Sequence, residues 1–231
     1  RLVGSEMCIR DSEDDSGLIK VAVLGNSKKV AQGDAVIALG NIFGYADGMS
    51  YGVVSASNYK ATFFDGECAV IATDIPAEEQ GTGMLFNMDG EVVGMISSSV
   101  WNDTGKNVVN AYGISDLKPI IELLINGKSV PYIGIYGTTV TEQLAEEHKM
   151  PSGIYVADVD PDSPAMAAGI QIGDIICEAS GEEIKDIAAY QNIVIGSSVG
   201  ETMEFVGKRL GSDGYVNIKF SVVTTEKEEV K

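Results

Sequence analysis

The chain has 231 residues, of which 45% are hydrophobic and 22% charged, a composition typical of a globular protein with one large or two ordinary domains. It has 34 acidic and 16 basic residues, and its formal net charge is −18. This charge argues against nucleic acid and anionic lipid as partners, because both attract clusters of Lys and Arg. No run of about eighteen apolar residues is present, so we expect no membrane span in this chain.

Metal and redox sites are also not expected. The chain has three cysteines, Cys8, Cys68 and Cys177, and one histidine, His148. No two cysteines have the C-x-x-C spacing typical of metal ligands. Because Cys68 and Cys177 stand in apolar, strand-like runs, we expect both to be buried free thiols. We therefore predict no metal and no cofactor.

The first residues, RLVGSEMCIRDSEDDSG, begin with Arg and show no hydrophobic pattern. They lack the apolar core of a signal peptide. We interpret residues 1–12 as an unstructured or foreign tail and expect the true N-terminal part of the protein to be missing here.

Short apolar runs separated by turns follow from Leu18. They read LIKVAVLG, DAVIALG and YGVVSAS, and then ECAVIATD, MLFNMDG and EVVGMISSSVW. Runs of this length and spacing predict an antiparallel barrel or sandwich. The Asp89–Gly90 dipeptide between two such runs predicts a β-hairpin.

The pattern changes to a helical period in ISDLKPIIELLING. Five apolar side chains have helical spacing: Leu117, Ile120, Ile121, Leu124 and Ile125. Ser115 or Asp116 is expected to cap the first turn, and Gly127 to end the helix. Residues 115–130 are therefore predicted to be a helix and linker between two units.

A compact block of strands with two short helices is predicted to follow. In SPAMAAG, Ser163 is a helix cap, Pro164 takes the first helical position and Gly169 ends the helix. A second helix is predicted from about Ile187 to Ile195. ETMEFVGKRL and GYVNIKFSVV, joined by GSDG, predict a closing hairpin.

Several of these runs resemble the HtrA/DegP family of trypsin-like serine proteases. GDAVIALGNIFG and YGVVSAS are similar to the family's GD-x-V-x-A-x-GNPFG and SG-x-V-S, and L-x-N-x-DGEV-x-G to the segment around its nucleophile. NAYGISDLKPIIELLINGK resembles its closing strand and exit helix. The resemblance covers roughly residues 14–128 and implies a mostly β fold. Residues 13–114 would form the second six-stranded antiparallel β-barrel of a trypsin-like protease domain.

Residues 131–225 resemble a PDZ domain of the same family, a β-sandwich or partial barrel with two helices. YIGI corresponds to its carboxylate-binding loop. GIYVADVDPDSPAMAAGIQIGDIICEASGEEI follows the family pattern nearly without gaps. Residues 226–231 are expected to be a tail.

The resemblance fails where the family carries its nucleophile. Active relatives have AAINPGNSGGP after TD, whereas this chain has IPAEEQGTGM, one residue shorter. Either Gly81 or Thr82 therefore stands at the place of the serine. A threonine adds a methyl group that crowds the attacking oxygen, and Glu78 and Glu79 would place negative charge beside a developing oxyanion.

The rest of the catalytic triad is also not found in this sequence. The family's histidine lies in the first barrel, which this chain lacks, and His148 is expected to be a solvated residue. The family's aspartate matches Gly17, and the nearby Asp14 and Asp15 have no histidine to orient. We therefore predict no catalytic residue.

The PDZ-like loop points to a different activity. Successive backbone N–H groups can hold a terminal carboxylate, while an exposed strand edge accepts the peptide as an added strand. We expect the groove between the strand from Ile133 and the helix around Tyr190 and Val194. A groove filled by the chain itself, or without function, is the alternative. The predicted peptide-binding residues are Tyr132, Ile133, Gly134, Ile135, Tyr190 and Val194.

Together these features predict an HtrA-like pseudoprotease that binds polypeptide C-termini or unfolded segments in protein quality control. The resemblance implies a cell-envelope or extracellular location, with a membrane anchor in the missing N-terminus. One alternative is a serine-type endopeptidase that is active in its full-length form. Another is a non-catalytic scaffold that forms homo-oligomers, since members of this family commonly form trimers.

Overall fold

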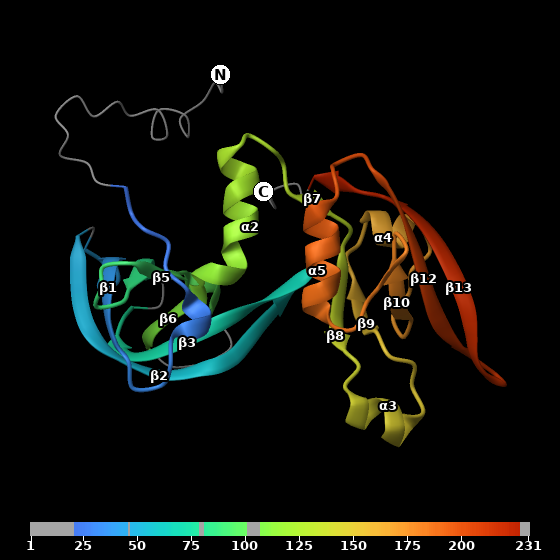
Figure 1. Cartoon of the computed structure of the whole chain (residues 1–231), viewed down its shortest axis with the longest axis horizontal. Coiled ribbons are helices and arrows are strands. Elements are labelled where there is room, and N and C mark those ends of the chain that lie inside the picture. The colour runs from blue at the N-terminus through green and yellow to red at the C-terminus, as the bar shows by residue number, and fades with distance from the viewer. Residues whose placement is uncertain (1–20, 46, 79–80, 101–106, 227–231) are drawn as a thin grey trace. The chain divides into compact units, whose positions relative to one another are not determined.

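The computed structural model describes residues 21–45, 47–78, 81–100 and 107–226 (Figure 1). The chain divides into two compact units. The first runs to Tyr59 and includes Ala69–Lys118 and Ile125–Gly127. The second comprises Lys60–Cys68, Pro119–Leu124 and the chain from Lys128 onward. The helices are η1 (Ser27–Lys29), η2 (Ser98–Val100), α2 (Ile114–Ile125), α3 (Glu142–His148), α4 (Pro164–Ala167) and α5 (Ile187–Gly196).

The first unit is built on a closed antiparallel barrel. Its strands are β1 (Ala35–Asn41), β2 (Gly48–Phe63), β3 (Gly66–Pro76), β4 (Thr82–Phe86), β5 (Val92–Ile96) and β6 (Val108–Gly113). They follow the order β1-β2-β3-β6-β5-β4, and β4 pairs back with β1. Alternate side chains such as Val36 and Ala38 on β1 face the core, which is why short apolar runs predicted these strands. The six-stranded barrel is confirmed.

The hairpin predicted at Asp89–Gly90 joins β4 to β5. The side-chain oxygen of Asn87 accepts hydrogen bonds from the amides of Asp89, at 3.1 Å, and Glu91, at 2.9 Å. Gly90 has φ +79°, a conformation that other residues rarely adopt. The hairpin forms where the sequence predicted it, with Gly90 in the left-handed conformation, but the part played by Asn87 was not predicted.

Helix α2 begins earlier than predicted, and its expected caps are wrong. Ser115 and Asp116 lie inside the first turn, where they bind neighbouring elements. Ser115 exchanges two hydrogen bonds with Ser27 of η1, each between the amide of one residue and the hydroxyl of the other, at 2.9 and 3.0 Å. Asp116 accepts from the amide of Ala69 on β3, at 2.9 Å. Gly127, with φ +69°, follows the helix as expected.

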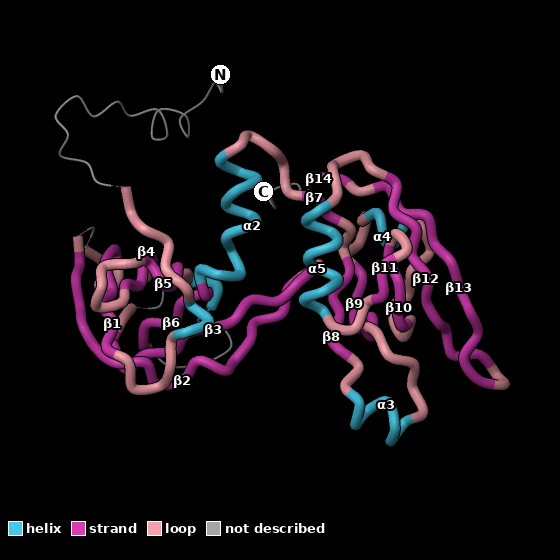
Figure 2. Tube along the Cα trace, viewed as in Figure 1, coloured by secondary structure: helices cyan, strands magenta, loops and turns pink. Residues whose placement is uncertain are grey.

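The second unit contains a larger sheet and a short strand pair (Figure 2). Its strands are β7 (Pro131–Tyr132), β8 (Ile135–Thr139), β9 (Ile154–Val159), β10 (Ile175–Ala179), β11 (Glu182–Glu183), β12 (Thr202–Gly211), β13 (Gly214–Val223) and β14 (Thr225–Glu226). The sheet has the order β13-β12-β10-β9-β8, with β11 beside β10, while β14 pairs with β7. The predicted β12–β13 hairpin is confirmed. Among the described strands, β8 therefore forms an edge of the sheet.

Both helices predicted in this unit are present, and a third was missed. The Ser163 hydroxyl caps α4 by accepting from the amide of Met166, at 3.2 Å, and Gly169 follows the helix with φ +86°. Helix α5 matches its predicted range to within one residue. The missed helix, α3, is capped by Thr141 and has no buried residue. It lacks the apolar stripe by which amphipathic helices are detected.

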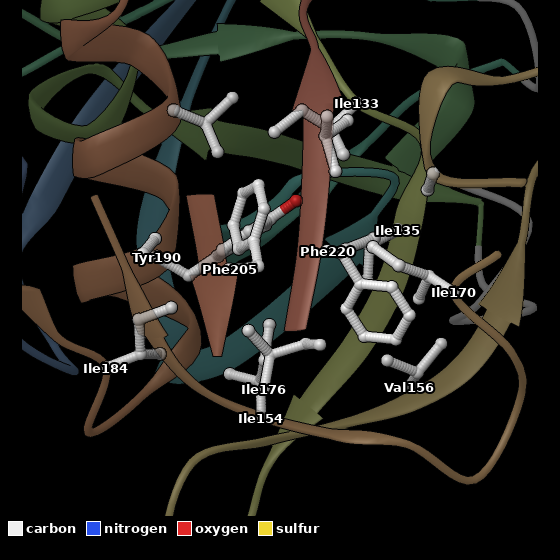
Figure 3. Close-up of a cluster of buried hydrophobic side chains, with 14 of the residues drawn as sticks. Ile133, Ile135, Ile154, Val156, Ile170, Ile176, Ile184, Tyr190, Phe205 and Phe220 are labelled. Carbon is white, nitrogen blue, oxygen red and sulfur yellow. The ribbon is translucent and has the colours of Figure 1, made fainter. Parts of the chain in front are cut away.

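The core of the second unit gathers apolar side chains from the sheet and from α5 (Figure 3). Within it, the rings of Tyr190 and Phe205 lie 6.4 Å apart. Asp174, which directly precedes β10, is fully buried and forms a bidentate ion pair with Arg209, with N···O distances of 2.6 and 2.7 Å. This pair and the apolar cluster hold the unit together.

The cysteines differ from each other. Cys68 is buried, as predicted. Cys177 is only half-buried, contrary to prediction, because it stands at a register shift between β10 and β12. Its partial burial still raises the pKa of its thiol, and the positive charge of Lys208 opposes this. In the described part of the chain, no helix is long and apolar enough to cross a membrane.

Candidate peptide-binding site and the loop between β3 and β4

In the described part of the loop between β3 and β4, three backbone amides near the expected nucleophile positions donate to carbonyls. The amide of Ala77 donates to the carbonyl of Asn107 at 3.1 Å, and that of Glu78 to the carbonyl of Ile42 at 2.9 Å. The amide of Gly81 donates to Glu78 at 2.9 Å. An oxyanion hole requires N–H groups that point at the reacting oxygen. These three amides are already bound to carbonyls.

Thr82 is not at the tip of a tight turn. It is the exposed first residue of β4 and pairs with Asn41 of β1. Directly after it, Gly83 approaches β1 so closely that an added Cβ would lie 2.1 Å from the carbonyl oxygen of Leu39. Thr82 is therefore held in a strand ladder, with its backbone fixed by the barrel.

The single histidine of the chain, His148, is exposed at the end of α3 in the second unit. The barrel unit consequently has no histidine of its own. The other residues considered for the catalytic site, Asp14, Asp15, Gly17 and Glu79, lie outside the described residues.

The predicted carboxylate-binding loop, Tyr132–Ile135, runs from β7 into β8. Its carbonyls are fixed from one side: that of Ile133 accepts from the amide of Ala165 at the start of α4, and that of Gly134 from the amide of Asp160, both at 2.9 Å. Since the peptide unit is planar and trans, each carbonyl fixed on one side directs the following N–H to the other. The SPA segment that predicted a helix start thus also orients this loop.

Those N–H groups converge on one carboxylate. The amides of Ile133 and Gly134 both donate to Oδ2 of Asp65, at 2.7 Å, and that of Ile135 donates to Oδ1 at 3.0 Å. The hydroxyl of Tyr190 donates to the same Oδ1 at 2.6 Å. The loop is thus a set of backbone donors shaped for a carboxylate, with one phenol beside it.

Gly134 makes this geometry accessible. Its φ is +94°, and an added Cβ would lie 2.3 Å from Cβ of Ser163. A side chain at this position would therefore be strained by the backbone conformation and would also collide with the cap of α4. Glycine in the YIGI segment is required on both counts.

The electrostatics of the site are set by burial. Asp65 is only 8% exposed, and burial raises its pKa, while the hydrogen bonds from Tyr190 and the three amides act in the opposite direction. Burial, together with the charge of Asp65, also raises the pKa of Tyr190 well above its usual value. Tyr190 therefore stays protonated and acts as a donor.

The predicted peptide-binding side chains lie mostly in the core. Ile133, Ile135, Tyr190 and Val194 are at most 1% exposed in this structure. Figure 3 shows the first three of them within the core cluster. Tyr132 is buried and donates its hydroxyl hydrogen to Asp160. What reaches the bound carboxylate is the backbone of the loop and the hydroxyl of Tyr190. Whether a peptide takes this place remains a prediction.

Comparisons with known proteins match this architecture. A family model of the PDZ domain matches residues 155–209. A DegP-like periplasmic serine endoprotease of Halomonas elongata is 29% identical over 94% of this chain and 48% of its own length. A Do-like HtrA serine protease of Bacillus subtilis is 28% identical over 99% of this chain and 55% of its own length. The chain is homologous to the HtrA/DegP serine endoproteases and contains a PDZ domain. It spans about half the length of the curated relatives it matches.

Solved structures give the fold of this HtrA homologue. The HtrA-type protease AlgW with tripeptide has a TM-score of 0.61 at 22% identity, over 92% of this chain and 73% of that chain. The serine endoprotease of Yersinia pestis has a TM-score of 0.57 at 24% identity, over 94% and 70%. The fold is thus a trypsin-like barrel followed by a PDZ domain, as the sequence predicted.

One residue of the site was missed by sequence reasoning. Asp65 stands in the turn between β2 and β3, 68 residues before Ile133. The sequence shows only an Asp-Gly dipeptide between two strand-like runs, which is an ordinary turn pattern. Nothing local indicates that this carboxylate is bound elsewhere.

Proposed function

We propose that this HtrA homologue is a non-catalytic peptide-binding protein of the cell envelope that recognises the free C-terminal carboxylates of polypeptides. The observation that carries the proposal is the convergence of the Ile133, Gly134 and Ile135 amides on a single carboxylate, at 2.7 to 3.0 Å. Three aligned backbone donors recognise a carboxylate whatever chain it belongs to.

The edge of β8 supports a peptide ligand in particular. Among the described strands, β8 pairs only with β9. Its other edge, where the carbonyl of Ile135 accepts from the amide of Asp65, would take an added strand that continues from the loop once Asp65 is displaced. Backbone pairing along β8 would supply affinity and the carboxylate would fix the register. The AlgW structures, which are described with a tripeptide and a decapeptide, are consistent with a peptide ligand for this fold.

The non-catalytic half of the proposal rests on the β3–β4 loop. Its amides at Ala77, Glu78 and Gly81 are bound by carbonyls, and the barrel unit has no histidine. The envelope location is supported by relatives whose names describe them as periplasmic.

The peptide proposal is tested by following the amide resonances of the loop during a peptide titration. Pentapeptides that end in Val, Leu, Ile or Phe with a free carboxylate are compared with the same peptides carrying a C-terminal amide. We expect the Ile133, Gly134 and Ile135 amides to shift with the free-acid peptides only. Shifts with both forms contradict recognition of the carboxylate.

The competing function is serine-type proteolysis by the full-length protein, which the homology to serine endoproteases favours. Casein turnover by the complete gene product, compared with its Thr82→Ala variant, separates the two. We expect no turnover that depends on Thr82. Turnover that is lost in Thr82→Ala would establish the protease instead.

A further inference from the structure

The carboxylate loop of this structure is already occupied by the chain itself. Asp65 presents two groups to it: its carboxylate binds the three loop amides, and its own backbone N–H donates to the carbonyl of Ile135 at 2.7 Å. The last residue of a peptide offers the same two groups, a carboxylate and the N–H of the same residue. Asp65 therefore reproduces the hydrogen-bonding pattern of a C-terminal residue from the middle of the chain.

The conformation of Asp65 is adapted to this placement. The two-residue turn Phe64–Asp65 joins β2 to β3, and Asp65 has φ +63°, which is uncommon for a residue other than glycine. In this conformation the N–H and the side-chain carboxylate both reach the loop. A turn that served only to reverse the chain would be accommodated with less strain by glycine at this position.

A small number of further contacts hold the tip of the turn. The amide of Glu67 donates to the side-chain oxygen of Gln191 on α5, at 3.2 Å. The ring of Phe64 packs edge-on against Tyr136 of β8, with 5.8 Å between ring centroids. The tip, within Lys60–Cys68, groups with the second unit rather than with the barrel that its strands help to build. These contacts lie on the edge strand and helix between which a peptide is expected.

We propose that Asp65 is an internal ligand that keeps the peptide site closed until a free polypeptide C-terminus displaces it. This inference rests on the proposed function, because it assigns a regulation to the same loop. Occupation by an internal carboxylate lowers the apparent affinity of any external one by the fraction of molecules in which the loop is open.

The variant that tests the inference is Asp65→Asn. Asparagine tolerates the left-handed conformation and keeps the size of the side chain. It removes the negative charge, and its NH2 group would face loop amides that are themselves donors. Asp65→Gly is the second variant, since glycine adopts the same φ and removes the side chain altogether. Asp213→Asn, in the exposed β12–β13 turn, is the matched control.

Affinity is measured by fluorescence anisotropy with fluorescein-labelled pentapeptides that end in Val, Leu, Ile or Phe as free acids. If fewer than a tenth of the molecules have an open loop, the Asp65 variants bind at least about tenfold more tightly than the wild type. Asp213→Asn is expected to bind like the wild type. Amide spectra of each variant verify that the second unit is folded.

The outcomes separate the inference from the proposed function. Tighter binding by Asp65→Asn and Asp65→Gly supports both. Binding by the wild type and both variants within about threefold of each other supports the proposed function but overturns the internal ligand. No binding of any free-acid peptide to folded Asp65→Gly overturns the proposed function, and the regulation with it.

Discussion

Two loops of this HtrA homologue differ in the groups to which their backbone amides donate hydrogen bonds. Between β3 and β4, the amides of Ala77, Glu78 and Gly81 donate to carbonyls of the barrel and of the loop itself. In the segment from β7 into β8, three consecutive amides donate to the side-chain carboxylate of Asp65. The described amides of the first loop are thus bound to backbone carbonyls, whereas those of the second are bound to a side-chain carboxylate.

The difference shows which kind of site tolerates sequence change. A serine-protease site needs three side chains in register as well as aligned amides. The carboxylate loop needs a glycine at residue 134 and two anchored carbonyls, and most of its side chains serve the core. A site made of backbone therefore persists wherever the fold persists, while a site made of side chains is lost with a few substitutions.

Gly134→Ala, in the loop from β7 into β8, should have the largest effect on stability and on peptide binding. The substitution combines a positive φ with a Cβ placed 2.3 Å from Cβ of Ser163, so we expect a loss of roughly 3 kcal/mol in the free energy of unfolding. Peptide-induced shifts at Ile133 and Ile135 should also disappear. Urea unfolding and the amide titration measure the two effects.

The control for this variant is Gly200→Ala. Gly200 has φ +85°, but no atom lies within 4 Å of its added Cβ, so only the backbone strain applies. We expect a loss of about 1 kcal/mol and unchanged peptide binding. Equal losses at both glycines would show that the contact with Ser163 does not shape the loop.

Arg209→Ala separates the stability of the PDZ unit from the loop. It leaves Asp174 buried without its cation, and because the Arg209 side chain is 33% exposed we expect a loss of about 2 kcal/mol rather than the larger value typical of fully buried pairs. The amides of Ile133–Ile135 should keep their chemical shifts. Movement of those resonances would mean that the ion pair also positions the loop.

The pH dependence of Asp65 follows from its raised pKa. The buried carboxyl group of Asp65 binds its proton more tightly than that of an exposed Asp, which titrates at about pH 3.9. Its contribution to the free energy of unfolding is therefore complete below about pH 4 and falls as the pH rises through the pKa of Asp65 in the folded protein. The groups around it are the Tyr190 hydroxyl and the hydrogen-bonded pair of Tyr132 and Asp160.

Carboxyl carbon NMR measures this titration directly, and Asp65→Asn identifies the resonance. The difference in unfolding free energy between the wild type and Asp65→Asn should decrease as pH rises from about 4. A carboxyl that titrates below its usual range would show instead that the four hydrogen bonds outweigh the effect of burial.

Thr82→Ala should have the smallest effect of all. Thr82 is exposed at the start of β4, so we expect a change below about 0.5 kcal/mol in the free energy of unfolding. Gly81→Ser, which places a hydroxyl at the other candidate position, should produce no covalent adduct with a fluorophosphonate probe. Labelling of Gly81→Ser would reveal an oxyanion site in this loop.

The sequence predicted those parts of the fold that depend on neighbouring residues. The cap of α4 at Ser163, the hairpin at Gly90 and the end of α2 at Gly127 each follow from a residue acting on its own turn. The resemblance placed the barrel, the PDZ unit and the YIGI loop. Helix α3 was missed because none of its residues is buried, so it has no apolar stripe.

The interactions that the sequence did not predict join distant residues. Ser115 was expected to cap its own helix, yet its partner is Ser27, 88 residues away. Asp65 and Ile133 are separated by 68 residues. A carboxylate in a turn has the same local pattern whether water or three amides surround it, so only the tertiary structure distinguishes the two.

The turn that carries Asp65 is part of the same polypeptide as the loop that binds it. Its effective concentration at the loop is set by the chain that connects them and does not fall when the protein is diluted. The fraction of molecules with a closed loop therefore does not depend on protein concentration. The concentration of an external C-terminus must be high enough to compete with this fixed effective concentration. If free C-termini displace Asp65 as proposed, the site would respond to the abundance of exposed C-termini around the protein and not to the abundance of the protein itself.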